Sequence, residues 1–127
     1  MNKFVGIEYK HPNPDYDPNI KNNKKTLFTI TFKDSYRIFP GSLNELCDKF
    51  NVVGKFGSYD QDRFNNIDVF FNEELLSLII IYAIQDSICL YQCLIKAQEE
   101  YLVNYLVSIC NIWSTSTLSL KIYRTCL

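Results

Sequence analysis

The stretch "NEELLSLIIIYAIQDSICLYQCLIKAQEEY", residues 72–101, is the longest apolar segment of the chain and decides how the chain can fold. Asn72 is a good helix N-cap, and the two glutamates after it suit the positive end of a helix dipole. The pattern predicts a helix from residue 73 to about 103. Its apolar residues run nearly all round over 75–95, so we expect this helix to be buried on more than one side.

Shorter patterns on either side predict smaller elements. "TLFTITFKD", residues 26–34, alternates apolar and polar side chains like a half-buried strand. "SYRIF", residues 35–39, can pair with it in a hairpin, with the long helix covering one face. A Ser-x-x-Glu capping box then begins a short helix over about 42–50. "STSTLSLKIYRT", residues 114–125, gives a third helical pattern.

The chain length and the polar segments bound the domain organisation. At 127 residues the chain is long enough for one domain. Residues 1–25 hold all but one of the prolines and predict a disordered or irregular N-terminal segment. Residues 51–71 are polar and rich in Gly, Asp and Asn, which predicts a loop. The folded part therefore covers residues 26–127.

Charge and cysteine usage exclude several classes of protein. Thirteen basic and fourteen acidic residues give a net charge of -1, which provides no global attraction to nucleic acid or membranes. No uninterrupted apolar window reaches the roughly 18 residues of a membrane span. The five cysteines include no CxxC pair, and their odd number is unlike a secreted disulfide scaffold. We expect reduced thiols that serve as small hydrophobic side chains rather than a zinc site.

One carboxylate interrupts the apolar run. Asp86 follows Tyr82 by four residues, so both project from one face of the predicted helix. A charge inside an apolar helix is costly unless it is paired. Two interpretations are open. Asp86 can lie at the polar edge of the helix while Tyr82 is a core aromatic, or Asp86 can be a metal ligand with Tyr82 beside it.

Three blocks of sequence favour the second interpretation when they are taken together. They are "FKDSYRIFPGSLNELCDKFNV" (32–52), "EELLSLIIIYAIQDSICLYQCLIKAQ" (73–98) and "STSTLSLKIYRT" (114–125). Their order and spacing resemble B-family, protein-primed DNA polymerases of linear mitochondrial plasmids and their organellar relatives. In that family a similar "DSY" block precedes a helix with Tyr-x-x-x-Asp, the third motif of the 3′–5′ exonuclease domain. The resemblance covers about residues 26–125.

The resemblance implies a fold and a site. The fold would be an α+β fragment of a ribonuclease-H-like exonuclease domain: a β-hairpin, a short helix and a long buried helix, truncated at both ends. Asp86 would bind a catalytic Mg²⁺ or Mn²⁺ ion, with Tyr82 beside the attacking water. Two-metal hydrolysis of a phosphodiester needs several carboxylates to hold the ions. The implied partner is the single-stranded 3′ end of DNA.

The sequence also departs from the family pattern. Three further carboxylates belong in an upstream Asp-x-Glu pair and a later Asn-to-Asp motif, and this chain has neither. Glu8, Asp15 and Asp17 stand in no strand-like context, and Asp34 matches the family's "DS" by position rather than as a metal ligand. Lys55 partly matches a lysine motif that would contact phosphate, but a solvated loop lysine is the simpler interpretation.

These observations lead to one expected function and one alternative. We expect a fragment of a DNA-directed DNA polymerase (a nucleotidyltransferase of DNA replication) that is inactive alone and functions only with a complementing polymerase chain. The palm motifs of a polymerase are absent. The alternative is a small helical protein-interaction module without catalysis, which uses "EELLSLIIIYAIQ" (73–85) as a surface for a partner. Neither interpretation involves a membrane. The abundant residues Asn, Ile, Lys, Tyr and Phe have codons rich in A and T, as in an organellar genome. This usage and the family together predict a mitochondrial location.

Overall fold

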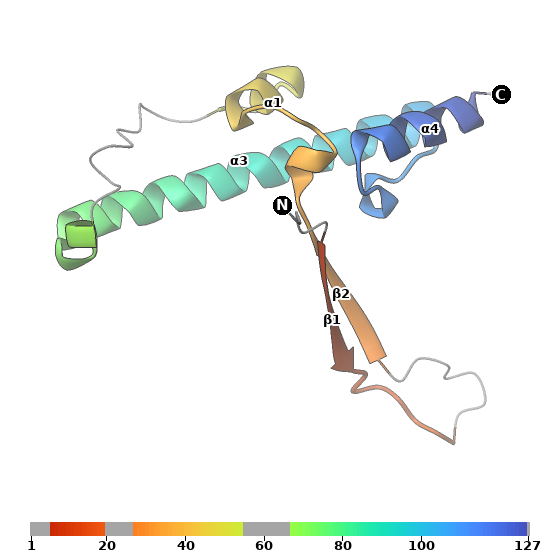
Figure 1. The fold of residues 1–127 in the computed structure, drawn as a ribbon, viewed down its shortest axis with the longest axis horizontal. Coiled ribbons are helices and arrows are strands. Elements are labelled where there is room, and N and C mark those ends of the chain that lie inside the picture. Colours follow the sequence, from red (N-terminus) through yellow and green to blue (C-terminus); the bar gives the residue numbers. More distant parts are fainter. Residues whose placement is uncertain (1–5, 20–26, 55–66, 127) are drawn as a thin grey trace, which may run out of the picture.

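The computed structural model describes residues 6–19, 27–54 and 67–126. In chain order it contains β1 (Gly6–Pro12), β2 (Leu27–Lys33), the 3-10 helix η1 (Ser35–Arg37), α1 (Leu43–Lys49), η2 (Ile67–Phe71), α3 (Glu73–Tyr105), η3 (Ile109–Asn111) and α4 (Thr115–Thr125). Figure 1 shows α3 as a long rod, with α1 and α4 against it and the two-stranded hairpin projecting away. The predicted α+β class, with a hairpin, a short helix and one long helix, is confirmed.

The ends of α3 follow from its sequence. The Asn72 side chain accepts hydrogen bonds from the N–H groups of Glu74 and Leu75, at 3.1 Å each, and so satisfies two donors that have no partner within the helix. At the other end Leu106 adopts a left-handed conformation with φ of 55°. Its N–H donates to the Leu102 carbonyl, which closes the last turn. The predicted helix is therefore confirmed and runs two residues further than expected.

The predicted capping box of α1 is present. Ser42 accepts from the Glu45 N–H at 3.3 Å, and a Glu45 carboxylate oxygen accepts from the Ser42 N–H at 2.6 Å. The bond from the Ser42 N–H, together with the Ser42 side chain, favours the ionised carboxyl and lowers the pKa of Glu45 from its ordinary value of 4.5. The helix that follows brings Leu46 and Cys47 into the core.

The core lies between α3 and the elements along one of its sides. From α3 come Cys89, Cys93 and Ala97, each with 0% of its surface exposed. The buried residues that pack around them are Ile38, Phe39, Leu46, Cys47, Phe50, Val107, Ile109, Ile112 and Leu118. Two polar contacts connect the surrounding elements: Gln98 of α3 accepts from the Ile109 N–H at 2.8 Å, and the Thr115 hydroxyl of α4 donates to the Ile38 carbonyl at 2.9 Å.

The predicted pairing of residues 26–34 with 35–39 is wrong. Asp34 accepts a hydrogen bond from the Tyr36 N–H at 3.0 Å and starts η1, which turns residues 35–39 into the helical core. β2 pairs instead with β1, antiparallel, from Gly6 opposite Lys33 to Pro12 opposite Leu27. The expectation of an irregular segment over 1–25 is therefore wrong for β1.

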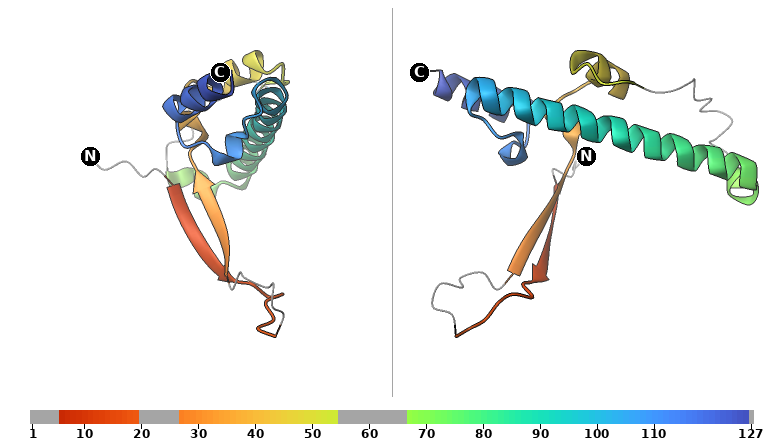
Figure 2. Two further views of the ribbon diagram at one scale, coloured as in Figure 1. Left: turned by 90° about the vertical axis from the view of Figure 1, so that its right-hand side faces the viewer. Right: turned by 180° about the vertical axis from the view of Figure 1, so that it is seen from behind.

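Pairing between the strands creates one apolar and one polar face. Directly opposite residues share a face. One face therefore carries His11 and all of the larger apolar side chains except Leu27, which are Ile7, Tyr9, Phe28, Ile30 and Phe32. Every residue of β1 is exposed, and so is every residue of β2 except Lys33. The expectation that the long helix covers one face of the hairpin is therefore wrong, as Figure 2 shows from two further sides.

The hairpin is attached at its base. The Lys33 ammonium lies 4.3 Å from the centroid of the Trp113 ring and donates to the carbonyls of Cys110 and Ile112. Gly6, opposite Lys33, lies so close to Trp113 that a Cβ built on it would be 2.6 Å from an indole carbon. A cation–π contact and a close glycine approach therefore join the hairpin to the η3 region.

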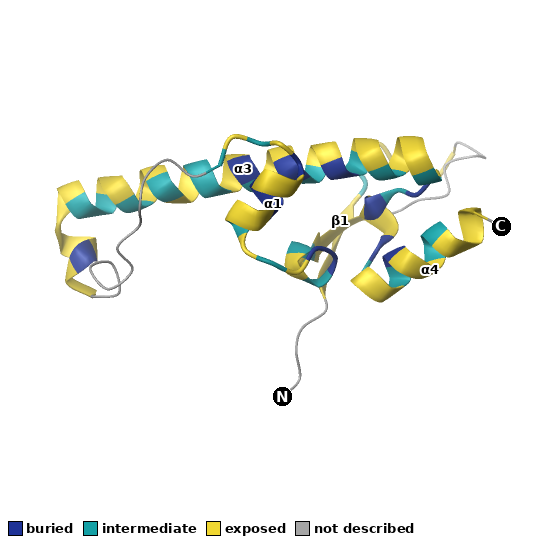
Figure 3. Cartoon of the chain, turned by 90° about the horizontal axis from the view of Figure 1, so that it is seen from above, coloured by how far each residue is buried: buried dark blue, intermediate teal, exposed yellow. Residues whose placement is uncertain are grey.

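Burial of α3 is one-sided. Figure 3 shows a buried and half-buried band along the helix beside exposed surface. Exposed apolar side chains run along the helix opposite the core: Ile80, Ile84, Ile88, Tyr91, Ile95 and Leu102. The prediction of burial on more than one side is wrong for the described residues, because no described element packs on that side.

We predict that Ser42→Ala lowers the free energy of unfolding by about 1 kcal/mol, because the Glu45 N–H loses its acceptor. The Glu45 pKa is lowered in the folded state, so its carboxylate stabilises the fold above its ordinary pKa of 4.5, and this contribution disappears as pH falls through the folded pKa. Urea unfolding at pH 7 and pH 3 measures both effects. Ser116→Ala, at an exposed α4 serine, is the control; an equal loss there would contradict the prediction.

We also predict that Gly6→Ala loosens the base of the hairpin, because the new methyl group would overlap the Trp113 ring and the Phe32 carbonyl oxygen, 2.8 Å from it. Trp113 is the only tryptophan, so its fluorescence reports this contact directly and should shift to longer wavelength. Gly54→Ala is the matched control, since its Cβ would meet Cys47 at an ordinary 3.7 Å. Unchanged emission in Gly6→Ala would contradict the described attachment.

Candidate functional site

Tyr82 and Asp86 lie one turn apart on α3, as their spacing predicted, and both are half-buried. Cys89 follows Asp86 by three residues, and Cys93 follows Cys89 by four. All four side chains therefore lie on the face of α3 that packs in the core. One carboxylate oxygen of Asp86 is shielded from solvent. The pair therefore lies in a partly dehydrated setting, where a carboxylate interacts strongly with a cation.

The hairpin does not lie beside this pair. β1 and β2 project away from α3, and the core face of α3 meets α1 instead (Figure 1). No strand of the described chain therefore faces Asp86 as the strands of a ribonuclease-H-like sheet would.

Other acidic residues singled out from the sequence are scattered. Glu8 lies in β1, which corrects the expectation that its context is not strand-like. Asp34 caps η1, in keeping with a positional role, and Asp17 accepts from the Asn19 N–H at 2.8 Å in a turn. Within residues 6–19, 27–54 and 67–126, no three His, Cys, Asp or Glu side chains come together in a way that could hold a metal ion. The described residues therefore do not fit a two-metal site by themselves, and Lys55 lies outside them.

A cluster of three buried thiols lies on the same face of α3. The Cys93 thiol donates to the Cys47 sulfur across the α1–α3 contact at 3.8 Å, and the Cys89 thiol donates to the Val53 carbonyl at 3.4 Å. Burial, together with the neighbouring thiols Cys93 and Cys89, raises the pKa of Cys47 to about 12. All five cysteines are free, and these three behave as neutral, small core side chains.

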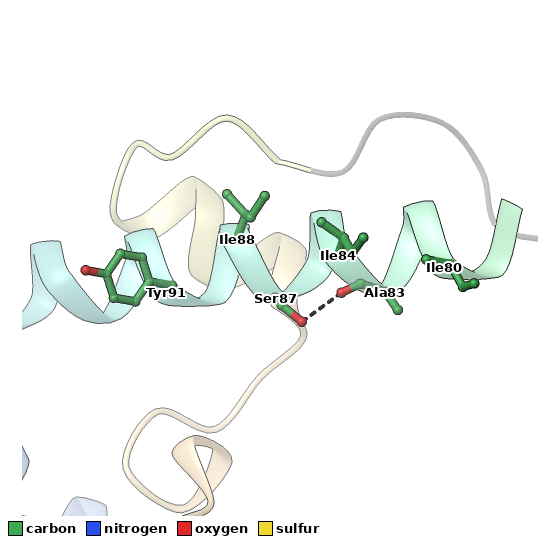
Figure 4. A pocket seen from close by; sticks show the side chains of 6 residues that line it. All are labelled: Ile80, Ala83, Ile84, Ser87, Ile88 and Tyr91. Atoms are coloured by element: carbon green, nitrogen blue, oxygen red, sulfur yellow. Dashed lines mark hydrogen bonds between the residues drawn. The ribbon is translucent and has the colours of Figure 1, made fainter. Parts of the chain in front are cut away.

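The opposite side of α3 carries an open apolar depression of about 470 Å³, lined by Ile80, Ala83, Ile84, Ser87, Ile88 and Tyr91. Figure 4 shows these side chains along one stretch of the helix, with the Ser87 hydroxyl hydrogen-bonded to the Ala83 carbonyl. None of the six is charged. Three of these residues lie within 73–85, the surface that the alternative interpretation gives to a partner. The other three were not predicted, although the three- and four-residue spacing of the isoleucines could have indicated Ile88.

By length and composition, α3 is long and apolar enough to cross a membrane. The sequence analysis looked for an uninterrupted apolar window and therefore did not indicate this. Only a small share of its most apolar window is buried. Residues Cys89, Cys93 and Ala97 of the same helix are fully covered by other parts of the chain. A bilayer around α3 would have to displace that packing.

Comparisons of this chain with protein-family models, with curated proteins and with solved structures found no match.

We predict that thiol reagents at pH 8 label Cys110 and Cys126 quickly, since both are exposed, while Cys47, Cys89 and Cys93 stay protected until the chain unfolds. The unfolded Cys47 thiol ionises near 9.0 and the folded one near 12, so its protonated form favours the fold below pH 9 and that stability is lost as pH rises from 9 to 12. Mass spectrometry of timed labelling tests the first part and urea unfolding against pH the second. Fast labelling of Cys93 in the folded chain would contradict the described core.

Proposed function

We propose that this chain is part of a B-family, protein-primed DNA polymerase, from the end of its 3′–5′ exonuclease domain. In this proposal Tyr82 and Asp86 are its contribution to the exonuclease site. The observation that carries it is the placement of the two residues one turn apart on a half-buried face, with a carboxylate oxygen of Asp86 shielded from water. A divalent cation would interact strongly with a carboxylate in that setting.

The positions of the three resembling blocks support this proposal. The block over 32–52 forms the end of β2, η1 and α1, the block over 73–98 lies within α3, and the block over 114–125 forms α4. The chain thus has the helix with the Tyr-x-x-x-Asp motif at the expected place in the order of elements. The missing Asp-x-Glu strand would supply the carboxylates that the described residues lack.

The roles of the two residues follow from their chemistry. Asp86 would provide one ligand for Mg²⁺ or Mn²⁺, ions that prefer oxygen donors. The Tyr82 phenol can donate a hydrogen bond to a phosphate oxygen or to a water molecule on the same side of α3. One carboxylate cannot hold two ions, so the chain alone is expected to lack exonuclease activity, and activity would require the acidic strands of a complementing chain.

A second candidate is a helical protein-interaction module without catalysis. The observation that favours it is the amount of uncovered apolar surface, on one face of the β1–β2 hairpin and along α3 opposite the core. Exposed apolar patches of this kind mark binding surfaces. In this alternative Asp86 only pairs at the edge of the core, and its replacement would alter stability rather than nuclease activity.

We predict that the purified chain does not degrade single-stranded DNA with Mg²⁺ or Mn²⁺. Co-expressed with the strand-bearing part of a plasmid-type exonuclease domain truncated before its own Tyr-x-x-x-Asp helix, it should restore 3′–5′ degradation. Asp86→Ala should lower the restored rate by at least about 100-fold, and Tyr82→Phe by about 10-fold, as typical for groups at the reacting centre. A gel assay of a 5′-labelled oligonucleotide measures these rates.

Asp48→Ala is the control, because Asp48 is an exposed carboxylate on α1. It should leave the restored rate unchanged. Two results would contradict the proposal. One is a restored activity that survives Asp86→Ala. The other is that no complementing exonuclease part, although it folds on its own, gains activity when this chain is added. Robust metal-dependent degradation by the chain alone, lost in Asp86→Ala, would show instead that it already holds a complete site.

A further inference from the structure

Two of the buried thiols lie against each other across the contact between α1 and α3. The Cys93 thiol donates to the Cys47 sulfur at 3.8 Å, and the two residues are 46 positions apart in the chain. An S–S bond is about 2.05 Å long, so the two sulfur atoms have to approach by about 1.8 Å to form one. Rotation of these two short side chains can bring the sulfur atoms closer while the helices stay packed.

The chain just after α1 is held to α3 on both sides of Cys93. One turn before it, the Cys89 thiol donates to the Val53 carbonyl at 3.4 Å. About one turn after it, the Lys96 ammonium donates to the Asn51 carbonyl at 2.7 Å. These bonds fix the end of α1 over this part of α3. The fold therefore brings the Cys47 and Cys93 thiols together before any bond forms between them.

A third thiol lies beside this pair but is less suited to form the bond. Cys89 also interacts with Cys47. Its sulfur, however, has two other partners, because it donates to the Val53 carbonyl and accepts from the Gln85 side-chain amide at 3.5 Å. A bond from Cys89 would take this donor away from the Val53 carbonyl, whereas the Cys93 thiol already donates to Cys47.

Burial determines when such a bond can form. Only the thiolate attacks a disulfide, and burial raises the pKa of Cys47 to about 12. Cys47 and Cys93 are also only 1% and 0% exposed, so an oxidant does not reach them while α1 is packed on α3. The bond therefore forms during folding or when α1 transiently leaves α3, and the restored packing then covers it.

We propose that Cys47 and Cys93 form a disulfide under oxidising conditions and that this bond locks α1 onto α3. The oxidant is a small disulfide such as oxidised glutathione. One thiolate of the chain attacks it and releases one reduced glutathione, and the second thiolate attacks the mixed disulfide and releases the other. The two cysteines lose two electrons and two protons, which the two released thiols carry away. The inference does not rest on the proposed polymerase function, because it uses only the α1–α3 contact.

Folding and formation of this bond are linked. If the fold holds the two sulfur atoms in a suitable arrangement, the ratio of oxidised to reduced chain in a fixed glutathione buffer rises on folding. The disulfide then raises the folding equilibrium constant by the same factor. Native disulfides stabilise small domains by a factor of at least about 30. A badly directed pair of thiols would give a factor near one or below it.

The test uses the full chain with Cys110→Ser and Cys126→Ser, which removes the two exposed thiols. Starting from both the reduced and the oxidised form, the chain is equilibrated with reduced and oxidised glutathione in native buffer and in urea. After an acid quench, alkylation in denaturant and mass spectrometry count the free thiols. The ratio of oxidised to reduced chain should be at least about 30-fold higher in native buffer than in urea. Peptide mapping should place the bond between Cys47 and Cys93.

Two variants in this background separate the pair from its neighbour. Cys93→Ala should abolish the preference for the oxidised form in native buffer, and Cys89→Ala should keep it. The two variants are matched, because each removes a fully buried thiol from the same face of α3. Circular dichroism must show equal helix content in both.

Two results from the background chain alone would overturn the proposal, whether or not the variants fold. One is an equal ratio of oxidised to reduced chain in native buffer and in urea. The other is a main oxidised product in which Cys89 forms the bond.

Discussion

The contact between α1 and the middle of α3 is the interaction on which the rest of the structure depends. Cys89, Cys93 and Ala97 present a row of small side chains along α3, which lets α1 approach closely enough for the Cys47 and Cys93 sulfurs to touch at 3.8 Å. Phe39 and Phe50 close the core beside this contact, with ring centroids 5.7 Å apart. η1 and α4 are attached to this core, and among the described residues Lys33, Gly6 and Trp113 join the base of the hairpin to it.

Local signals in the sequence were sufficient to predict the positions of the helices. The caps at Asn72 and Ser42 involve neighbouring backbone groups, so residue type and spacing alone predicted where α3 and α1 begin. Pairing of β2 could not be predicted in the same way, because its partner β1 lies across an intervening segment and contains Pro12. Asp34 also redirected the chain, since its side chain starts η1 where the alternation suggested a second strand.

The side of α3 that is buried was the least predictable feature. Isoleucines and cysteines are both apolar, so hydropathy could not distinguish the covered face from the uncovered one. Size makes the difference: close helix packing selects Cys93 and Ala97, while the larger Ile84 and Ile88 remain outside. For the candidate site, spacing predicted that Tyr82 and Asp86 share a face, but the companions of Asp86 depend on long-range contacts that local patterns do not encode.

The two faces of α3 differ in what covers them. The face with Tyr82 and Asp86 continues into the core, where a carboxylate is partly shielded from water, and exposed isoleucines lie on the far side. A helix that is apolar all round normally requires cover on all sides. Here the described elements cover one side, and the isoleucines of the other side are exposed.

Solvent accessibility of the isoleucine methyl groups tests this two-faced helix most directly. In a methyl-labelled chain, diluted until it is monomeric, a soluble paramagnetic probe should broaden the NMR signals of Ile80, Ile84 and Ile88 strongly and those of Ile38 and Ile112 weakly, in line with their burial. If Ile84 and Ile88 were as protected as Ile112 in the monomer, another part of the chain would cover the far side of α3, and the account of a helix buried on one face would be wrong.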